Sequence, residues 1–355
     1  MKIKEIRAYK VNLDLTRPYT IAYKTISQVE NVIVELELEN GIMGMGASNP
    51  SKYVVDESVK EVANKLTSEN LEWLRGRDIR QYQQHCYELG QQFQEAPGTW
   101  AALDIALHDA FAQYLGLPLY KFLGKKTKVL PTSITIGIMN VEDTLKEARD
   151  YVDQKFKILK VKLGNSLEED IERIAKLRET FGTNIVLRID ANQGYTFEQL
   201  VDFYHKTQKY TLELIEQPLP VEATESLRNL EEEIKQQIAL DESLISDLEA
   251  YRLTLQPKAC GIFNIKLMKS GGIQRAQHIA DIGNSAGMEL MWGCNDESIV
   301  SITAALHVAY ANPHTKYIDL DGSLDLANDV VSGGFAIKEG IMYPLDLPGL
   351  GIQKL

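Results

Sequence analysis

The chain has few cysteines, no long apolar run and no histidine cluster. Its three cysteines, Cys86, Cys260 and Cys294, are far apart, which argues against a disulfide framework or a zinc site and favours a reducing compartment. No segment reaches the roughly 18 apolar residues of a membrane helix, and the first residues lack the apolar core of a signal peptide. We therefore expect a cytoplasmic protein that does not bind a membrane.

Positive charge is also scarce, because 38 Lys and Arg stand against 50 Asp and Glu, for a formal net charge of −12. No block of basic residues is present, so a nucleic-acid partner is not expected and a small polar substrate is favoured. With 44% hydrophobic and 25% charged residues over 355 positions, the composition is that of a globular protein with more than one domain. Whether subunits pair into a homo-oligomer is left open.

From about residue 130 onward, short β-branched or leucine-rich runs alternate with amphipathic helical segments such as 167–180 and 272–285. This alternation is typical of βα units around a parallel sheet. The predicted strands are 132–137, 156–163, 184–189, 211–215, 237–240, 261–265, 288–292 and 316–320. Eight of them match a (β/α)₈ TIM barrel. An open doubly wound sheet is the alternative. The chain lacks the glycine-rich phosphate-binding motif of such a sheet, so a nucleotide cofactor is not expected.

The first 125 residues have the pattern of an α+β domain. Its predicted elements are strands at 4–12 and 29–39, a turn at Asn40-Gly41, and helices at about 56–66 and 96–115. The stretch after the eighth strand is expected to pack back on this domain. We thus predict an α/β protein in three parts: an N-terminal α+β capping domain at 1–125, a (β/α)₈ catalytic barrel at 126–322, and a C-terminal segment at 323–355 that completes the capping domain.

Charged residues end five consecutive predicted strands. Counted from the second lysine of the second strand, they follow one another in steps of 28, 26, 25 and 25 residues, about one βα unit each. Because the carboxyl ends of barrel strands share one rim, we expect these side chains to meet there. Unpaired charges are costly to bury, and a metal ion would resolve the conflict among the acids. In chain order the residues are Lys160 and Lys162, Asp190, Glu216, Asp241 and Lys266.

The three acids of this series form an all-oxygen ligand set, with no His or Cys nearby in the sequence. Such a set suits Mg²⁺ better than zinc. A single acid at a βα junction is more often a helix N-cap, but three in successive units favour a metal site. We therefore predict that Asp190, Glu216 and Asp241 bind Mg²⁺.

The lysines indicate the chemistry. Lys160 and Lys162 lie two residues apart on a strand, so both point to the same face, and in a barrel that face points inward. Two partly desolvated ammonium groups side by side disfavour double protonation, so one can act as a base. Lys266 lies opposite, and a carbon held between Lys162 and Lys266 could lose its proton to one and regain it from the other. The alternative is that a Lys-x-Lys pair is a solvated strand face.

These residues resemble the enolase superfamily and, within it, the muconate lactonizing enzyme subgroup. The resemblance runs nearly end to end and is carried by the strings LKVKLG at 159–164, IDANQG at 189–194, IEQP at 215–218, ALDES at 239–243 and NIKLMKSGG at 264–272. It implies the same magnesium ligands, with Lys162 and Lys266 as the paired acid/bases. It also implies that Lys160 supports Lys162 and touches the substrate carboxylate.

The eighth strand narrows the substrate. Asp319 and Asp321 in the string IDLDG resemble the Asp-x-Asp pair with which dipeptide epimerases hold the substrate ammonium. By itself this string is more often a turn or a cap. By resemblance, Thr135, Cys294 and Asp296 line the dipeptide backbone, although packing and capping roles are equally open for them.

The capping domain is expected to supply lids at 17–28 and 48–54 that exclude water. Lys24 in the first lid looks similar to a basic partner of a Glu side chain in Ala-Glu epimerases. We therefore predict a Mg²⁺-dependent epimerase that inverts the α-carbon of the C-terminal residue of an Ala-Ala, Ala-Glu or Ala-hydrophobic dipeptide. The alternatives are an N-acylamino-acid racemase, an o-succinylbenzoate synthase, a muconate cycloisomerase, or a non-catalytic ligand-binding barrel.

Overall fold

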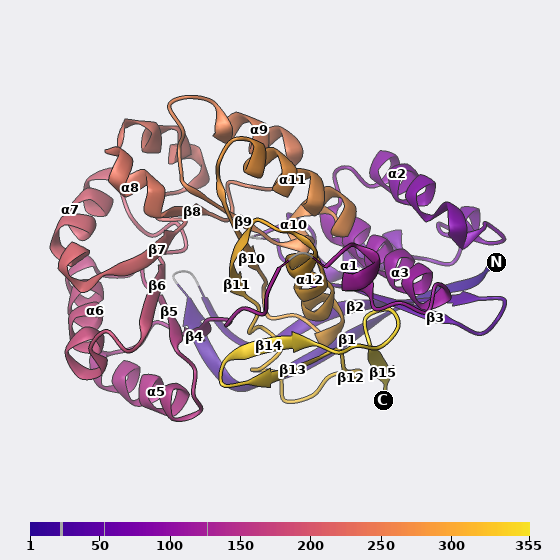
Figure 1. Ribbon diagram of the computed structural model, residues 1–355, viewed down its shortest axis with the longest axis horizontal. Coiled ribbons are helices and arrows are strands. Elements are labelled where there is room, and N and C mark those ends of the chain that lie inside the picture. The colour runs from indigo at the N-terminus through magenta and orange to yellow at the C-terminus, as the bar shows by residue number, and fades with distance from the viewer. Residues whose placement is uncertain (22–23, 53, 126) are drawn as a thin grey trace.

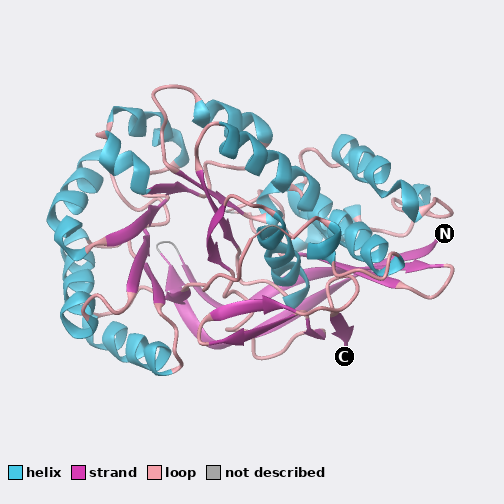
Figure 2. Ribbon diagram, in the orientation of Figure 1, coloured by secondary structure: helices cyan, strands magenta, loops and turns pink. Residues whose placement is uncertain are grey.

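Eight parallel strands form one curved sheet with helices around its outside (Figures 1 and 2). The computed structural model describes residues 1–21, 24–52, 54–125 and 127–355. The strands lie side by side in chain order, and a parallel bridge between Thr132 and Ile318 joins the first to the last. They are β4 (Ile134–Ile136), β5 (Ile158–Lys162), β6 (Val186–Asp190), β7 (Leu212–Glu216), β8 (Ile238–Leu240), β9 (Ile262–Ile265), β10 (Glu289–Gly293) and β11 (Thr315–Asp319). Each predicted strand range overlaps one of them, so the TIM barrel is confirmed.

The first three helices between these strands begin at side-chain caps that the sequence supplies. Asn140, Ser166 and Thr196 each accept a hydrogen bond from a backbone N–H of the first turn that follows. None of the described helices is both long and apolar enough to cross a membrane. The barrel helices are α5 (Val141–Asp153), α6 (Leu167–Phe181), α7 (Phe197–Thr207), the 3₁₀ helix η4 (Val221–Asn229), α8 (Glu232–Gln237), α9 (Asp247–Thr254), α10 (Leu267–Ser270), α11 (Ile273–Ser285) and α12 (Ile299–Ala311).

The capping domain is an antiparallel meander covered by helices, as predicted. Its strands are β1 (Ile3–Ile21), β2 (Lys24–Leu38) and β3 (Met43–Ser48), in that spatial order. Its helices are α1 (Val59–Lys65), α2 (Tyr82–Gln92), α3 (Pro97–Tyr114) and α4 (Leu119–Phe122). Helix α3 is buried along most of its length, because it packs on the meander on one side and on the barrel helices α10, α11 and α12 on the other.

The C-terminal residues form two short hairpin-like pairs beside the capping domain. Strand β12 (Val331–Gly333) pairs with β15 (Ile352–Lys354), and β13 (Phe335–Lys338) pairs with β14 (Ile341–Pro344). Asp109 of α3 accepts hydrogen bonds from Leu350 N at 2.7 Å and from Met45 N at 2.8 Å. This one carboxylate therefore links the C-terminal segment to the meander. The predicted fold class, a (β/α)₈ barrel with an α+β capping domain completed by the C-terminal segment, is confirmed. The three domain boundaries stay a prediction.

The first strand of the capping domain also pairs with the chain just after the last barrel strand. Leu15 forms an antiparallel bridge with Leu326, Thr16 N donates to Asp325 O at 2.7 Å, and Ala327 N donates to Asp14 O at 2.7 Å. The lid segment of β1 is therefore tied by main-chain hydrogen bonds to the barrel rim.

Candidate active site

The parallel register of the sheet places the predicted charged residues next to one another. Lys162 is paired with Asp190 across β5 and β6, and Asp190 is paired with Glu216 across β6 and β7. Each of these is the last residue of its strand, and Asp241 and Lys266 directly follow β8 and β9. The series read from the sequence thus lies along one rim of the barrel.

Lys160 is buried among three carboxylates. Its Nζ lies 2.7 Å from Asp319 Oδ2, 2.8 Å from Glu216 Oε2 and 3.2 Å from Asp190 Oδ2. Burial alone would lower the pKa of Lys160, but these three acids raise it well above its usual value. Of the two lysines on β5, Lys160 is therefore held charged, and the role of Lys162 as the base stays a prediction.

Lys162 and Lys266 each contact one carboxylate of the rim. Lys162 Nζ lies 2.7 Å from Asp190 Oδ2, and Lys266 Nζ lies 2.7 Å from Asp241 Oδ2. Both ammonium groups line the same cavity, whose volume is about 460 Å³. They reach it from β5 and from the end of β9, four strands apart in the sheet order. A substrate in this cavity therefore has a lysine on each side.

The carboxylates of the rim fit a divalent cation. Burial, together with the neighbouring Asp190, raises the pKa of Glu216 to about 8, although Lys160 opposes this. Burial and the charge of Asp241 likewise raise the pKa of Glu242 to about 7, and Glu242 Oε2 is buried without a hydrogen-bond partner among the described residues. An excess of buried carboxylate oxygens suits a hard cation such as Mg²⁺.

Asp319, the last residue of β11, and Asp321, two residues further on, have different surroundings. Asp319 accepts hydrogen bonds from Ser133 Oγ at 2.5 Å and from Lys160 Nζ at 2.7 Å, and its pKa is lowered because these partners outweigh its burial. Asp321 accepts one from Thr135 N at 2.7 Å, and burial together with Asp319 raises its pKa to about 7. Both aspartates line the cavity. A cationic ligand would therefore stabilise the charged form of Asp321 more than that of Asp319, which already has a cationic partner in Lys160.

The remaining predicted contacts are also brought to this cavity, with one exception. Thr135, Cys294 and Asp296 line it, together with residues of both predicted lids, including Arg17, Gln28, Asn49 and Ser51. The exception is Lys24, because its side chain lies outside the described residues. Its role toward a Glu side chain stays a prediction.

Sequence reasoning missed several residues that support the rim. Asn264 Nδ2 donates to Glu216 Oε1 at 2.8 Å, and Lys269 Nζ contacts Asp241 Oδ1. Asn264 lies two residues before Lys266, so the alternation that placed the lysines of β5 on one face could have found it. Lys269 could not be found in this way, because it lies on the helix after the strand.

Comparison with known proteins identifies the family. Residues 3–124 match the mandelate racemase / muconate lactonizing enzyme N-terminal domain, and residues 143–354 match the enolase C-terminal domain-like family. The L-Lys-D/L-Arg epimerase of Desulforapulum autotrophicum is 50% identical, over 100% of both chains. The L-Ala-D/L-Glu epimerase of Clostridium acetobutylicum is 33% identical, over 100% of this chain and 99% of the relative.

A solved structure agrees with these relatives. The dipeptide epimerase of Methylococcus capsulatus, complexed with Mg and the dipeptide L-Arg-D-Lys, superposes with a TM-score of 0.97 at 47% identity, over 99% of both chains. The chain therefore belongs to the enolase superfamily. Within it, the protein is an isomerase, a Mg²⁺-dependent dipeptide epimerase.

Proposed function

We propose that this epimerase acts on dipeptides with cationic side chains and inverts the α-carbon of the C-terminal residue. The observation that carries the proposal is the acidic wall of the cavity. Among the described residues, and apart from the charged residues of the rim and the pair Asp319 and Asp321, five acids and two basic residues, Arg17 and Lys52, line the part of the cavity toward the lids and the last strands. The exposed Lys52 is already paired with Asp56 and Glu61. The five acids are Glu30, Glu57, Glu147, Asp296 and Asp325, of which Glu57 is paired with Lys65.

Three of these acids influence one another. Burial raises the pKa of Asp325 to about 6, and the charges of Asp296 and Glu147 act in the same direction, although the nearby Arg17 opposes them. Glu147 also has a raised pKa, chiefly because of burial, although Tyr151 donates a hydrogen bond to it at 3.1 Å. Carboxylates that crowd one another at the wall of a cavity are stabilised by a cation, here a Lys or Arg side chain.

Glu147, Asp296 and Asp325 are here called the acidic group. Their position relates them to one end of the substrate. Asp325 contributes to the raised pKa of Asp321, so the two carboxylates are neighbours. If Asp321 holds the ammonium of the dipeptide, then Glu147, Asp296 and Asp325 are placed to contact the side chain of the N-terminal residue. We therefore infer that the acidic group selects a cationic N-terminal residue.

The comparisons do not establish the alanine-containing dipeptide that the sequence suggested. Relatives named for L-Lys-D/L-Arg are 50% and 47% identical to this chain, whereas the L-Ala-D/L-Glu epimerases of Clostridium acetobutylicum and Bacillus subtilis are 33% and 31% identical. The cationic preference agrees with the more similar relatives and with the charge of the cavity.

The proposed chemistry assigns the α-proton to two lysines. We propose that Lys162 and Lys266 stand on opposite faces of the α-carbon, so that one removes the proton and the other, already protonated, returns one to the opposite face. Lys160, held charged, would contact the substrate carboxylate. Inversion would follow because the neutral amine of one lysine and the ammonium of the other approach the α-carbon from opposite sides of the barrel.

The acids of the rim would hold the metal. We propose Asp190, Glu216 and Asp241 as its ligands. When bound, Mg²⁺ supplies positive charge that stabilises the carboxylate oxygens of the substrate as the α-proton leaves. Asn264 fixes one oxygen of Glu216, and Lys269 fixes one oxygen of Asp241. These contacts leave the second oxygen of each acid directed toward the lysines.

The test is α-proton exchange in D₂O with Mg²⁺, followed by mass spectrometry and NMR. L-Lys-L-Arg is expected to exchange and invert with a kcat/KM at least about tenfold above that of L-Ala-L-Glu or L-Ala-L-Ala, which corresponds to about 1.4 kcal/mol. A preference for either alanine dipeptide would overturn the cationic assignment.

A further inference from the structure

Lys266 begins a short segment, Lys266–Gly272, here called the α10 turn. Lys266 is the N-cap of α10, and its carbonyl accepts hydrogen bonds from Lys269 N at 3.1 Å and from Ser270 Oγ at 2.9 Å. The turn ends at Gly271 and Gly272, whose φ angles are +85° and +107°. Because the backbone of Lys266 is part of this turn, a shift of the turn moves the base of the Lys266 side chain.

The capping domain encloses the α10 turn at its far end. Asp104 Oδ1 on α3 accepts a hydrogen bond from Ile273 N, the first residue of α11, at 2.5 Å. Gly272 approaches so closely that a Cβ there would lie 2.5 Å from Asp104 Oδ1. A Cβ on Gly271 would lie 2.5 Å from Trp100 Cε3. The two glycines thus allow α3 to pack directly against the backbone of the turn.

A second contact joins the turn to a lid. Asn49 N, in the lid at 48–54, donates to Met268 Sδ at 3.2 Å. The side chain of Met268 is fully buried. The α10 turn is therefore held by the capping domain at its middle and at its end.

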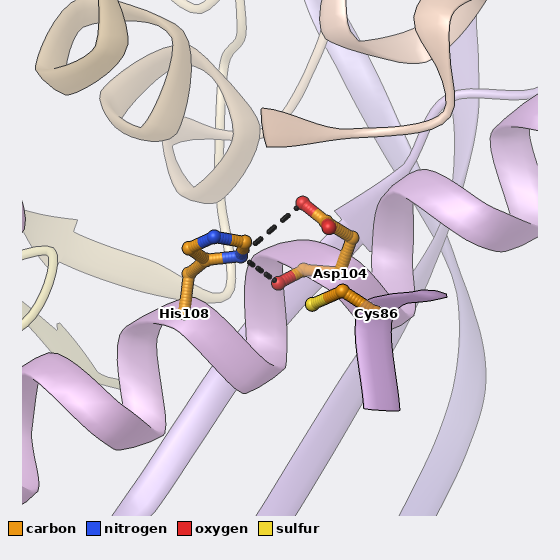
Figure 3. A group of neighbouring side chains, drawn as sticks. All are labelled: Cys86, Asp104 and His108. Atoms are coloured by element: carbon orange, nitrogen blue, oxygen red, sulfur yellow. Dashed lines mark hydrogen bonds and ion pairs between the residues drawn. The ribbon is translucent and has the colours of Figure 1, made fainter. Parts of the chain in front are cut away.

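Asp104 is itself held in place by a buried cluster (Figure 3). Cys86, Asp104 and His108 place their ligand-type atoms within 4.8 Å of one another. His108 Nδ1 lies 2.8 Å from Asp104 O and 3.3 Å from Asp104 Oδ1, so this nitrogen donates its hydrogen to the helix and to the carboxylate. A metal would need the lone pair of that nitrogen, and we interpret the cluster as a hydrogen-bonded support for Asp104.

Within the described part of the chain, the hydrogen bonds of the Lys162 side chain and carbonyl do not reach the capping domain. Its side chain is paired with Asp190, and its carbonyl accepts a hydrogen bond from Arg173 Nη1 at 2.9 Å. Both partners belong to the barrel. The two lysines on either side of the cavity are therefore supported by different parts of the molecule.

We propose that Asp104 is a positioning residue for Lys266, through which the capping domain sets the acid/base on one side of the substrate only. The proposal rests on the two-lysine mechanism above. Loss of Asp104 should then slow the removal of the proton that faces Lys266, while the proton that faces Lys162 continues to exchange.

The experiment compares α-proton exchange in D₂O from the two epimers of one dipeptide, L-Lys-L-Arg and L-Lys-D-Arg, under initial-rate conditions with Mg²⁺. In Asp104→Ala, exchange from one epimer is expected to fall at least about tenfold more than exchange from the other, and that epimer should be the one whose exchange Lys266→Ala abolishes. Asp104→Asn keeps an oxygen that can accept the hydrogen bond from Ile273 N, so this variant should recover most of the exchange rate that Asp104→Ala loses. Equal losses for both epimers in Asp104→Ala would overturn the proposal.

Asp109→Asn is the matched control. Asp109 lies one helical turn further along α3, is equally buried and hydrogen-bonds to Met45 and Leu350 instead of the α10 turn. It should lower both exchange rates alike. If Asp104→Ala does not fold, Trp100→Phe carries the test by the same criterion. A wild-type enzyme that exchanges no dipeptide α-proton would instead overturn the proposed function.

Discussion

Lys162 Nζ lies 2.7 Å from Asp190 Oδ2 on the neighbouring strand, so a proposed base is in direct contact with a proposed metal ligand. A cation bound by Asp190 would weaken this ion pair and release the lysine toward the substrate. The same argument applies to Lys266 and Asp241, whose atoms are also 2.7 Å apart.

Removing either base should give complementary defects. Lys162→Ala and Lys266→Ala are each expected to lower epimerisation by roughly 10²- to 10⁴-fold, the usual contribution of a general base. Each variant should still exchange the α-proton of one epimer, and the two variants should retain opposite epimers. NMR of both epimers in D₂O measures this. Full inversion by both variants would show that the two-base mechanism is wrong.

Mg²⁺ should stabilise the folded protein as well as support catalysis. Because three buried carboxylates repel one another at the rim, Mg²⁺ that binds only the folded state should raise the Tm as its concentration rises above Kd. Treatment with a chelator should abolish activity and lower the Tm, and added Mg²⁺ should restore both. Glu216→Gln is expected to weaken Mg²⁺ binding in calorimetry. The metal assignment fails if this variant binds Mg²⁺ as tightly as the wild type.

The acidic group should discriminate between the two positions of the dipeptide. Glu147→Gln and Asp325→Asn are each expected to lower kcat/KM for L-Lys-L-Ala by about tenfold, or about 1.4 kcal/mol, because a charge-assisted contact is lost. L-Ala-L-Lys serves as the control substrate, since its cationic side chain is at the other end. Equal losses of kcat/KM for both substrates would show that the acidic group does not select the side chain of the N-terminal residue.

A buried histidine should make the fold sensitive to acid. Burial lowers the pKa of His307 to about 3, while its Nδ1 accepts a hydrogen bond from Tyr120 N at 3.1 Å. The unfolded chain binds this proton near pH 6.5, so stability from this group is present above that pH and is lost as the pH falls toward 3.

The corresponding slope rises as the pH falls through 6.5 and approaches about 1.4 kcal/mol of unfolding free energy per pH unit from this one group near pH 5. Urea unfolding between pH 7 and pH 5 measures it. His307→Gln, which has no titratable group but keeps an acceptor, should flatten the profile by that amount. An unchanged slope in this variant would assign the acid sensitivity to other residues.

The barrel and its rim could be predicted because both repeat at a regular spacing. Lys162, Asp190 and Glu216 end successive strands, so parallel pairing alone brings them together. Strand β3 was missed because Gly44 and Gly46 are unfavourable in strands. Glycine is needed in this strand because helix α3 packs directly against it, and a Cβ on Gly46 would lie 1.9 Å from Ala102 O on α3.

The acidic wall could not be predicted from spacing. Glu147 lies on α5 and Asp325 lies beyond β11, and neither position follows the period of the strands. They come together only because helix α5 and the segment after β11 line the same cavity. The sequence therefore predicted an alanine-containing dipeptide, and the cationic side chain that we propose did not follow from it.

The bridge between Leu15 and Leu326 has a consequence for how specificity can change. The main chain of Thr16 hydrogen-bonds to Asp325 itself, so the lid and the acidic wall share one register. An insertion or deletion in either segment would shift the other by the same hydrogen bonds. Grafting a new specificity onto this scaffold would therefore require exchanging residues 14–17 and 321–327 together, as a single unit drawn from both ends of the chain.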